Sequence, residues 1–509
     1  MLARVLSSAI LGINAYLIEV EVDIQHGLPA WITVGLPDTV VKESKERIRS
    51  AIKNCGYYFP TDKITVNLAP ASQRKEGSAF DLPIALGILA ASGQIKTEIL
   101  KEYVFLGELS LDGRIKPVNG ILPVALCVRK EGLKGLIVPK GNVAEAAIIP
   151  DIEVMAVDNL PQVVDFLNNQ IDLPKASLNI EEVFNIEQDS QIDFQEVKGQ
   201  VYAKRALEIA AAGGHNVLMI GPPGAGKTML ARRLPTILPL LTFEEALETT
   251  RIYSVAGLLP QGQALITIRP FRAPHHTISD AGLVGGGQTP KPGEVTLAHN
   301  GVLFLDELPE FKRHVLEALR QPLEDGIVTV ARVGATVTYP ARFMLVCAMN
   351  PCPCGFLGDS KHQCTCSYLQ IQRYRAKVSG PLLDRIDIHI EVPAVSYQDL
   401  NQISEGESSK EIRKRVEAAR DIQKKRFAKK GIYCNAQMNS KLVNTFCVLD
   451  NAGKKLLETA MEKLGLSARA YTRILKIART IADLEGEKNI LSQHIAEAIQ
   501  YRTLDREMS

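Results

Sequence analysis

The feature that most constrains this chain is a glycine-rich run, Gly221-Pro-Pro-Gly-Ala-Gly-Lys227-Thr228. An apolar, strand-like segment at residues 216–220 precedes the run, and a segment of helical period at 227–234 follows it. Glycines let the backbone approach an anion closely, while its N–H groups and the start of the helix face the anion. The run therefore predicts a phosphate-binding loop between a buried strand and a helix.

Two side chains of this loop have specific expected tasks. Lys227 is expected to reach the terminal phosphates of a nucleotide, and Thr228 to supply a hydroxyl ligand for Mg²⁺. A chance match in a glycine-rich turn is the alternative, but the flanking strand and helix argue against it. We assign nucleotide contacts to Gly221, Pro222, Pro223, Gly224, Ala225, Gly226, Lys227, Thr228 and Met229.

A second apolar strand, at residues 301–305, ends in two acids, Asp306 and Glu307. Carboxylates at the end of such a strand lie at the sheet edge where a nucleotide-bound metal would sit. We expect Asp306 to hold Mg²⁺ through water and Glu307 to act as the general base that polarises an attacking water. Two surface acids that open a helix are the alternative, because acids are favoured there anyway.

Further motifs accompany Lys227, Asp306 and Glu307. They are Phe271-Arg-Ala-Pro-His-His276, Gly285-Gly-Gly287, Pro292-Gly-Glu-Val295 and Ala348-Met-Asn-Pro-Cys352. Together these motifs resemble the magnesium-chelatase-like branch of the AAA+ ATPases, and most closely its YifB/ComM competence-protein family. The resemblance covers nearly the whole chain, and it implies an ATP hydrolase that uses ATP and Mg²⁺ and assembles into a homohexameric ring.

The family pattern implies roles for three more side chains. Asn350, which follows an apolar strand at residues 343–348, matches the polar sensor aimed at the γ-phosphate and water. Arg385 matches the finger inserted into a neighbouring subunit's site, and Arg469 matches the lid sensor, with Arg473 as its rival. Each arginine could instead form a surface ion pair. Because a finger from a neighbour cannot act in a monomer, activity is expected to require the ring.

The length of 509 residues predicts several domains in an α/β protein. We expect a Lon-protease-like α/β domain at residues 1–170, a polar linker at 171–196, an AAA+ core with a parallel sheet at 197–393 and a helical lid domain at 394–509. Helical period and charge predict the last part's helices at 410–430, 452–464, 468–484 and 492–502.

The Lon-like assignment depends on two segments, at residues 74–81 and 105–120, that resemble the proteolytic domain of Lon. That family uses a serine and a lysine. Aligned without gaps, the serine position is Ala79, with Ser78 beside it, and the lysine position is Leu122. A serine without a base is a poor nucleophile, so we expect the fold to be retained and the peptidase chemistry lost.

Residues 327–342 alternate like two strands around Gly334, which predicts a hairpin with Arg332 near its tip. The resemblance puts such a hairpin in the central pore of a ring. One basic residue per subunit could there track the phosphate backbone of branched or single-stranded DNA, although the net charge is only +2. An ordinary sheet-edge hairpin is the alternative.

Nine cysteines include two CxC pairs, formed by Cys352, Cys354, Cys364 and Cys366. Four soft ligands suit one tetrahedral Zn²⁺, which would clip the loop that follows Asn350. His362 is a substitute ligand, and reduced thiols without metal are the alternative.

Two other clusters receive structural interpretations. Adjacent side chains diverge on a helix or a strand, so His275 and His276 are expected to form hydrogen bonds rather than to bind a metal. The basic run Lys424-Lys-Arg426, with Lys429-Lys430, is expected to be a solvated helix face, with DNA contact as the alternative.

The first 18 residues hold one arginine and a broken apolar stretch, which fits neither a signal peptide nor a membrane span. The sequence therefore predicts a cytoplasmic protein without a membrane partner. By resemblance, we expect a DNA helicase or translocase that migrates branches during recombination or natural transformation. The alternatives are an ATPase that remodels a protein, like the motor subunit of magnesium chelatase, and a Lon-type peptidase.

Overall fold

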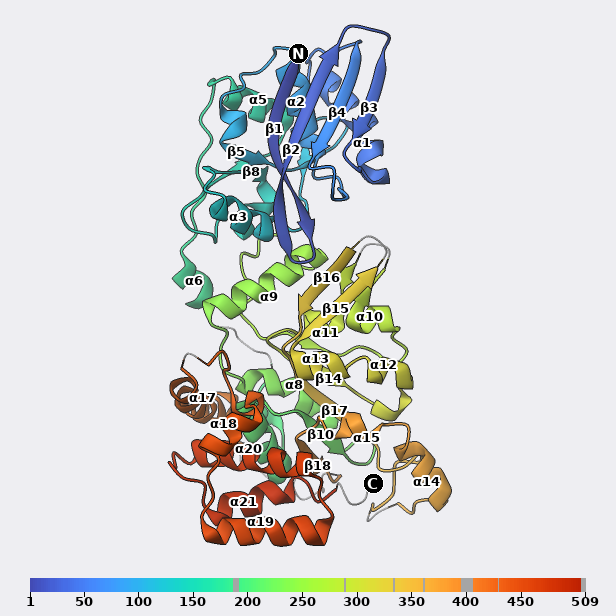
Figure 1. Cartoon of the computed structure of the whole chain (residues 1–509), viewed down its shortest axis with the longest axis vertical. Coiled ribbons are helices and arrows are strands. Elements are labelled where there is room, and N and C mark those ends of the chain that lie inside the picture. Colours follow the sequence, from blue (N-terminus) through green and yellow to red (C-terminus); the bar gives the residue numbers. More distant parts are fainter. Residues whose placement is uncertain are drawn as a thin grey trace. The chain divides into compact units, whose positions relative to one another are not determined.

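In a computed structural model of the chain, the described residues are 1–185, 192–287, 290–332, 335–359, 362–394, 406–428 and 430–504. The chain forms two compact units, and the sequence of each is interrupted by the other. The first comprises Met1–Glu187 and Phe243–Thr267, and the second comprises Gln188–Thr242 and Ile268–Ser509. The predicted α/β class is confirmed, since both units combine helices with a sheet (Figure 1). The predicted boundaries at 170, 196 and 393 stay predictions.

The first unit is built on a seven-stranded mixed sheet with the order β3-β4-β2-β1-β5-β8-β9. Its strands are β1 (Leu2–Leu11), β2 (Asn14–Gln25), β3 (Ala30–Val34), β4 (Lys63–Ala69), β5 (Tyr103–Phe105), β8 (Gly135–Pro139) and β9 (Glu153–Val157). The first two strands form a long antiparallel hairpin (Figure 1). In β4, alternate side chains are buried, as expected for a sheet with one covered face.

Helices α1 (Thr39–Asn54), α2 (Asp81–Ala91) and α3 (Ile121–Lys130) belong to this unit. Asp38 caps α1, because its Oδ1 accepts a hydrogen bond from the Val41 N–H at 2.8 Å. All residues of α2 are buried, so this helix forms the centre of the unit's core.

Helix α9 (Phe243–Ala256) lies in the predicted AAA+ core by sequence but packs against α3 in the first unit. Its Ser254 carbonyl accepts a hydrogen bond from the Gly120 N–H at 3.1 Å. The Ser254 hydroxyl donates to the buried Glu145 carboxylate. Arg251 donates to the Ile13 carbonyl at 3.1 Å. Residues 243–267 are therefore a structural part of the first unit.

The predicted linker contains ordered structure. Leu173 is buried, and Lys175 forms an isolated antiparallel β-bridge with Met155 of β9. Helix α6 (Ile180–Asn185) follows, and residues 186–191 lie outside the described part.

The second unit contains a five-stranded parallel sheet with the order β11-β14-β17-β10-β18 (Figure 1). The strands are β10 (Val217–Ile220), β11 (Phe271–Arg272), β14 (Val302–Leu305), β17 (Met344–Met349) and β18 (Ile388–Glu391). Every residue of β10, β14 and β17 is buried, which explains their continuous apolar sequences. Helices α7 (Val201–Gly213) and α8 (Lys227–Ile237) flank β10 in sequence.

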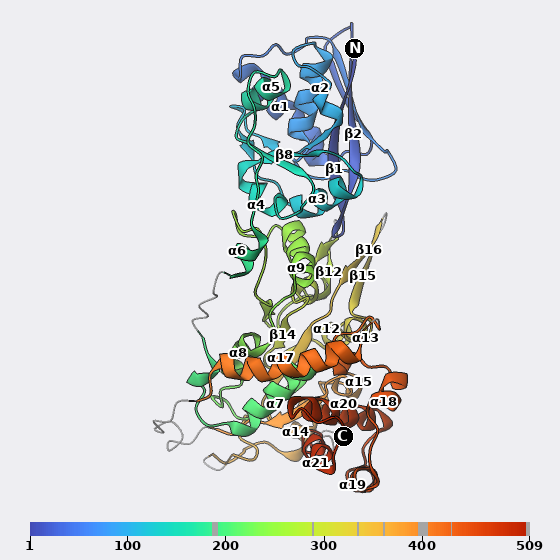
Figure 2. The ribbon, with the colours of Figure 1, turned by 90° about the vertical axis from the view of Figure 1, so that its left-hand side faces the viewer.

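The predicted C-terminal helices are confirmed with small shifts at their ends. They are α17 (Ser409–Arg426), α19 (Asn451–Leu464), α20 (Ala468–Leu484) and α21 (Ser492–Gln500). A further helix that was not predicted, α18 (Ser440–Phe446), lies between α17 and α19 in sequence. Figure 2 shows α17 and α20 beside α7. These helices share one hydrophobic core with the parallel sheet.

The predicted hairpin is also confirmed. Strands β15 (Ile327–Arg332) and β16 (Ala335–Pro340) pair antiparallel in a sheet of their own, with Arg332 opposite Ala335. Gly334 lies outside the described residues, as does the side chain of Arg332. Within the described part of the chain, no helix is both long enough and apolar enough to cross a membrane.

Candidate nucleotide site

The phosphate loop connects β10 to α8, as the sequence predicts. Gly224 and Gly226 have φ angles of 75° and 85°, a left-handed conformation that glycine adopts without strain. Lys227 begins α8, and its ammonium donates to the carbonyls of Gly221 at 2.6 Å and Pro222 at 3.0 Å. The ammonium of Lys227 thus lies within the loop and contacts the loop's own carbonyl groups.

Lys227 also joins the loop to the neighbouring strand. Its Nζ donates to Oδ1 of Asn350 at 3.1 Å, and Asn350 directly follows β17. Burial lowers the pKa of Lys227, while the nearby charge of Asp306 favours the ammonium form. The structure therefore brings together the predicted phosphate ligand and the predicted sensor.

Thr228 and Asp306 form the second contact of the site. The Thr228 hydroxyl donates to Oδ2 of Asp306 at 2.7 Å, although they are 78 residues apart in sequence. Strands β10, β17 and β14 are parallel neighbours, so their carboxyl ends meet at one edge. A hydroxyl and a carboxylate are oxygen ligands of the kind that Mg²⁺ prefers, so this pair fits the predicted magnesium site.

Glu307 has a histidine partner that sequence reasoning missed. Its Oε2 lies 3.2 Å from Nδ1 of His276, and its backbone N–H donates to Oδ1 of Asp306 at 2.9 Å. His276 comes shortly after β11, which pairs with β14. The sequence carried no local signal for this contact, because the contact depends on β11 and β14 being neighbours in the sheet.

The two adjacent histidines do form polar contacts, as predicted, but their rings do not diverge. The ring centroids of His275 and His276 are 4.1 Å apart. Nδ1 of His275 lies 2.9 Å from the Thr277 hydroxyl. They lie in an irregular turn, where the side-chain directions of regular elements do not apply.

The three predicted arginines are held by carboxylates near the 384–387 turn. Arg385 is buried, forms an ion pair with Glu324 and donates to the Pro381 carbonyl at 2.6 Å. Arg469 pairs with Asp384 at 3.0 Å, and its rival Arg473 pairs with Asp387 at 2.6 Å. Their roles as finger and lid sensor stay predictions.

Asp387 is the centre of a buried network that the sequence did not indicate. Its Oδ2 lies 3.2 Å from Nδ1 of His215, and Nε2 of that histidine lies 2.9 Å from the hydroxyl of Thr480 on α20. Burial alone would raise the pKa of Asp387, but Arg473 and His215 hold this pKa well below its usual value. The network ties the segment that precedes β10 to α20.

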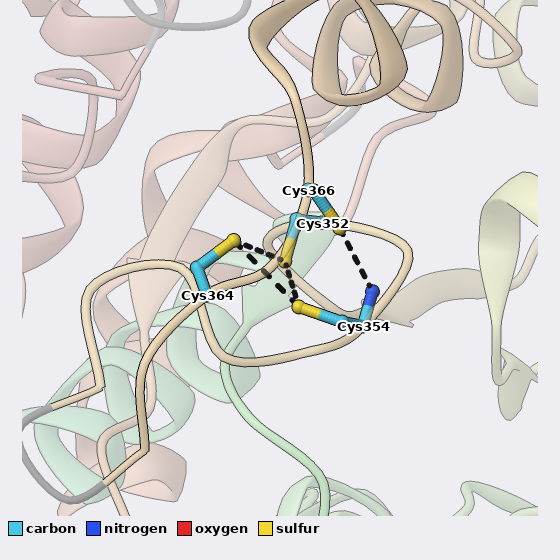
Figure 3. A group of neighbouring side chains, drawn as sticks. All are labelled: Cys352, Cys354, Cys364 and Cys366. Atoms are coloured by element: carbon cyan, nitrogen blue, oxygen red, sulfur yellow. Dashed lines mark hydrogen bonds between the residues drawn. The ribbon is translucent and has the colours of Figure 1, made fainter.

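The four cysteines converge on one point (Figure 3). Their sulfurs all lie within 4.8 Å of one another, and Sγ of Cys352 is 3.3 Å from that of Cys354 and 3.6 Å from that of Cys364. The predicted substitute ligand, His362, instead pairs with Asp359 at 3.4 Å. The four thiols are thus consistent with a zinc site.

In the basic run, Lys424, Lys425 and Lys430 are exposed, as the predicted solvated face requires, whereas Arg426 differs from the prediction. Lys429 lies outside the described residues. Arg426 is largely buried and forms an ion pair with Asp483, and it donates to Oδ1 of Asn435 at 3.1 Å. Lys424 pairs with Asp421 at 3.6 Å. The buried partner Asp483 explains the difference, because an acid in the core requires a counter-ion.

The first unit places Ser78 beside an acid. The Ser78 hydroxyl donates to Oε2 of Glu108, whose other oxygen lies 3.8 Å from Nζ of Lys116. Leu122, at the expected lysine position, is buried. The loss of peptidase chemistry stays a prediction.

A parallel sheet with a phosphate loop after β10, acids after β14 and a polar residue after β17 defines a P-loop ATPase of the AAA+ class. A model described as magnesium chelatase, subunit ChlI, matches residues 193–400. Two others, subunit ChlI of Mg-chelatase and magnesium chelatase, subunit ChlI C-terminal, match residues 20–142 and 406–502. The chain belongs to the YifB/ComM family of magnesium-chelatase-like ATPases.

Full-length relatives show this membership. The chain is 47% identical to competence protein ComM of Haemophilus influenzae over 99% of the chain and 98% of the relative. It is 46% identical to uncharacterized protein YifB of Escherichia coli K12 over the same shares. The magnesium-chelatase 38 kDa subunit of Rhodobacter capsulatus is 28% identical over 31% of the chain and 50% of the relative.

Proposed function

We propose that this ATPase couples ATP hydrolysis to the remodelling of DNA, as a ring-shaped branch-migration helicase. The observation that carries the proposal is the linked set of side chains at the ends of three adjacent strands. Lys227 contacts Asn350, and Thr228 contacts Asp306. Such a set serves hydrolysis, because phosphate ligand, metal ligand and sensor must act on one phosphate group.

Each residue of this set has a defined task in the proposed reaction. Lys227 exchanges its carbonyl partners for phosphate oxygens, and the backbone N–H groups of the loop hold the remaining charge. Thr228 and Asp306 would hold Mg²⁺, which supplies charge neutralisation when bound. Glu307 accepts a proton from water, and Asn350 orients that water.

His276 must release Glu307 for this step. A carboxylate engaged by a histidine 3.2 Å away has one oxygen fewer to accept a proton. The contact therefore represents a resting state in the proposed cycle. Glu307 could act as general base only after His276 moves away. Its activity would therefore depend on the position of the segment that follows β11.

The ring part of the proposal depends on the arginines. In a homohexamer, Arg385 would act on the ATP bound by the next subunit, and Arg469 would act on its own subunit's ATP. In the described chain, Arg385 and Arg469 are neutralised by Glu324 and Asp384. Exchanging these carboxylates for phosphate would couple nucleotide binding to the 384–387 turn.

The DNA part of the proposal is supported by a relative and by the hairpin. A full-length relative is named a competence protein. Strands β15 and β16 form a separate two-stranded sheet, as a projecting pore element requires. Arg332 stands at its end and would contact the phosphate backbone.

ATP turnover by the purified full chain, with and without branched DNA, tests the proposal. We expect branched DNA to stimulate ATP turnover. We also expect a labelled four-way DNA junction to be separated into duplexes, without strand cleavage, only when ATP is present. Glu307→Gln should bind ATP but fail in both assays. Turnover that is indifferent to DNA would contradict the DNA assignment. It would favour the second candidate, a protein-remodelling ATPase, which the match to magnesium chelatase models supports.

A further inference from the structure

The loop that carries the four cysteines lies against the phosphate loop. Gly355 follows Cys354, and its N–H donates to the Cys352 carbonyl at 3.0 Å. A methyl group added at Gly355 would lie 2.6 Å from Cδ of Pro223, within the phosphate loop. It would also lie 3.9 Å from Cγ of Asn350. Gly355 thus sits where the cysteine loop, the phosphate loop and the sensor meet.

This close approach requires glycine for two reasons. The φ angle of Gly355 is 89°, which an L side chain rarely adopts. The contact with Pro223 also leaves no room for a β-carbon. A backbone that packs directly against a proline ring transmits a displacement of one loop to the other, because close-packed atoms cannot absorb it.

The four sulfurs fit the geometry of bound zinc. A tetrahedral site with Zn–S bonds of about 2.3 Å separates its sulfurs by about 3.8 Å. Three of the sulfur pairs here lie 3.3 to 3.6 Å apart, and the Cys354 N–H donates to Sγ of Cys366 at 3.4 Å (Figure 3). Cys352 is buried, so that ligand comes from a fixed position two residues after Asn350.

We infer that the four-cysteine loop is a zinc-bound brace that positions Pro223 and Asn350, so that zinc occupancy controls ATP turnover through Gly355. The inference rests on the proposed ATPase site and assigns the cysteines to the nucleotide pocket rather than to DNA. Without zinc, the loop loses its crosslink, and the phosphate loop loses the surface against which Pro223 packs. Gly355 and Pro223 are positioning residues in this scheme.

Two glycine variants test the contact with Pro223 independently of zinc binding. Gly355→Ala leaves all four thiols in place but inserts a methyl group against Pro223. Gly358→Ala is the matched control, because Gly358 has a φ angle of 80° in the same loop. A methyl group at Gly358 would meet no atom within 4 Å. Both variants carry similar backbone strain, and only one disturbs the contact.

We expect both glycine variants to retain about one zinc per chain, measured by inductively coupled plasma mass spectrometry. Gly355→Ala should lower ATP turnover about tenfold and weaken binding of a fluorescent ATP analogue. Gly358→Ala should match the parent in both measurements. Equal turnover and equal nucleotide binding by the two variants would overturn the inference.

A variant that cannot bind zinc tests the role of the metal in a second experiment. Cys364→Ser should lose zinc and lose ATP turnover about tenfold or more, while DNA binding measured with the ATP analogue absent should persist. Parental turnover by zinc-free Cys364→Ser would overturn the brace. A parent protein that fails to hydrolyse ATP would instead overturn the proposed function, so the two failures are distinct.

Discussion

Each of the two units holds a hydroxyl group that donates to a carboxylate, but the charges around the two hydroxyl groups differ. In the second unit, Thr228 donates to Asp306 beside the cation Lys227, at the edge where parallel strands end. In the first unit, Ser78 donates to Glu108, which lies in a short two-stranded antiparallel sheet. A hydroxyl group becomes part of a reaction centre when its neighbours supply the charges that the reaction develops. We expect the second unit to meet this condition for phosphate chemistry. We expect the first not to meet it for a serine–lysine peptidase, because Leu122 stands at the expected lysine position.

The largest effect that would test this contrast is expected for Lys227→Ala. Removing the ammonium leaves the γ-phosphate charge uncompensated, so ATP turnover should fall by at least about 100-fold. Malachite-green phosphate release measures this loss. Lys53→Ala, at an exposed lysine of the first unit, is the control and should leave turnover unchanged. Parental activity of Lys227→Ala would remove the distinction between the units.

A pH effect is expected in the first unit. Burial raises the pKa of Asp81 to about 6 from 3.8, although Arg47 opposes the shift. The folded state therefore binds the Asp81 proton more tightly than the unfolded state. This contribution is fully present below pH 3.8 and is lost as the pH rises through about 6. Its loss corresponds to roughly 2 to 3 kcal/mol.

The single tryptophan, Trp31 in β3, reports on this unit in the full chain. Urea unfolding followed by its fluorescence should show the decline in stability between pH 4 and pH 6. Asp81→Asn cannot ionise, so its stability should vary less over that window. An unchanged pH profile in Asp81→Asn would contradict the assignment to this carboxyl.

A smaller effect is expected where α9 joins the first unit. Ser254→Ala removes one donor from the buried Glu145, which keeps its bonds from the Leu122 N–H and Asn142. The unit should lose about 1 to 2 kcal/mol in the Trp31 assay, and the amides of α9 should exchange faster. Unaltered exchange would mean that α9 is held to the unit without this contact.

The smallest effect is expected for Ser78→Ala. Its hydroxyl contacts Glu108 and has no place in the nucleotide site, so ATP turnover should stay within about twofold of the parent. Casein should remain uncut by both proteins. Casein cleavage by the parent that disappears in Ser78→Ala would revive the peptidase alternative and erase the contrast between the units.

Much of the second unit was predictable from local patterns. Apolar runs followed by Lys227, by Asp306 and by Asn350 indicated three strands whose ends carry functional groups, and the structure has these strands. Helix α20 has the predicted bounds, because its apolar period and the Ser467 cap are both local signals. The contact of His276 with Glu307 was not predicted, because it depends on which strands are neighbours.

The sequence by itself determined the phosphate loop, the acids after β14 and the four cysteines of the predicted zinc site, because these are encoded by residue type and short spacing. Only the tertiary structure decided that α9 joins the first unit, that Arg426 faces Asp483 and that Gly355 packs against Pro223. These features depend on contacts between segments far apart in the chain. No local pattern specifies such contacts, since the free energy that selects them comes from burial and pairing in the folded whole.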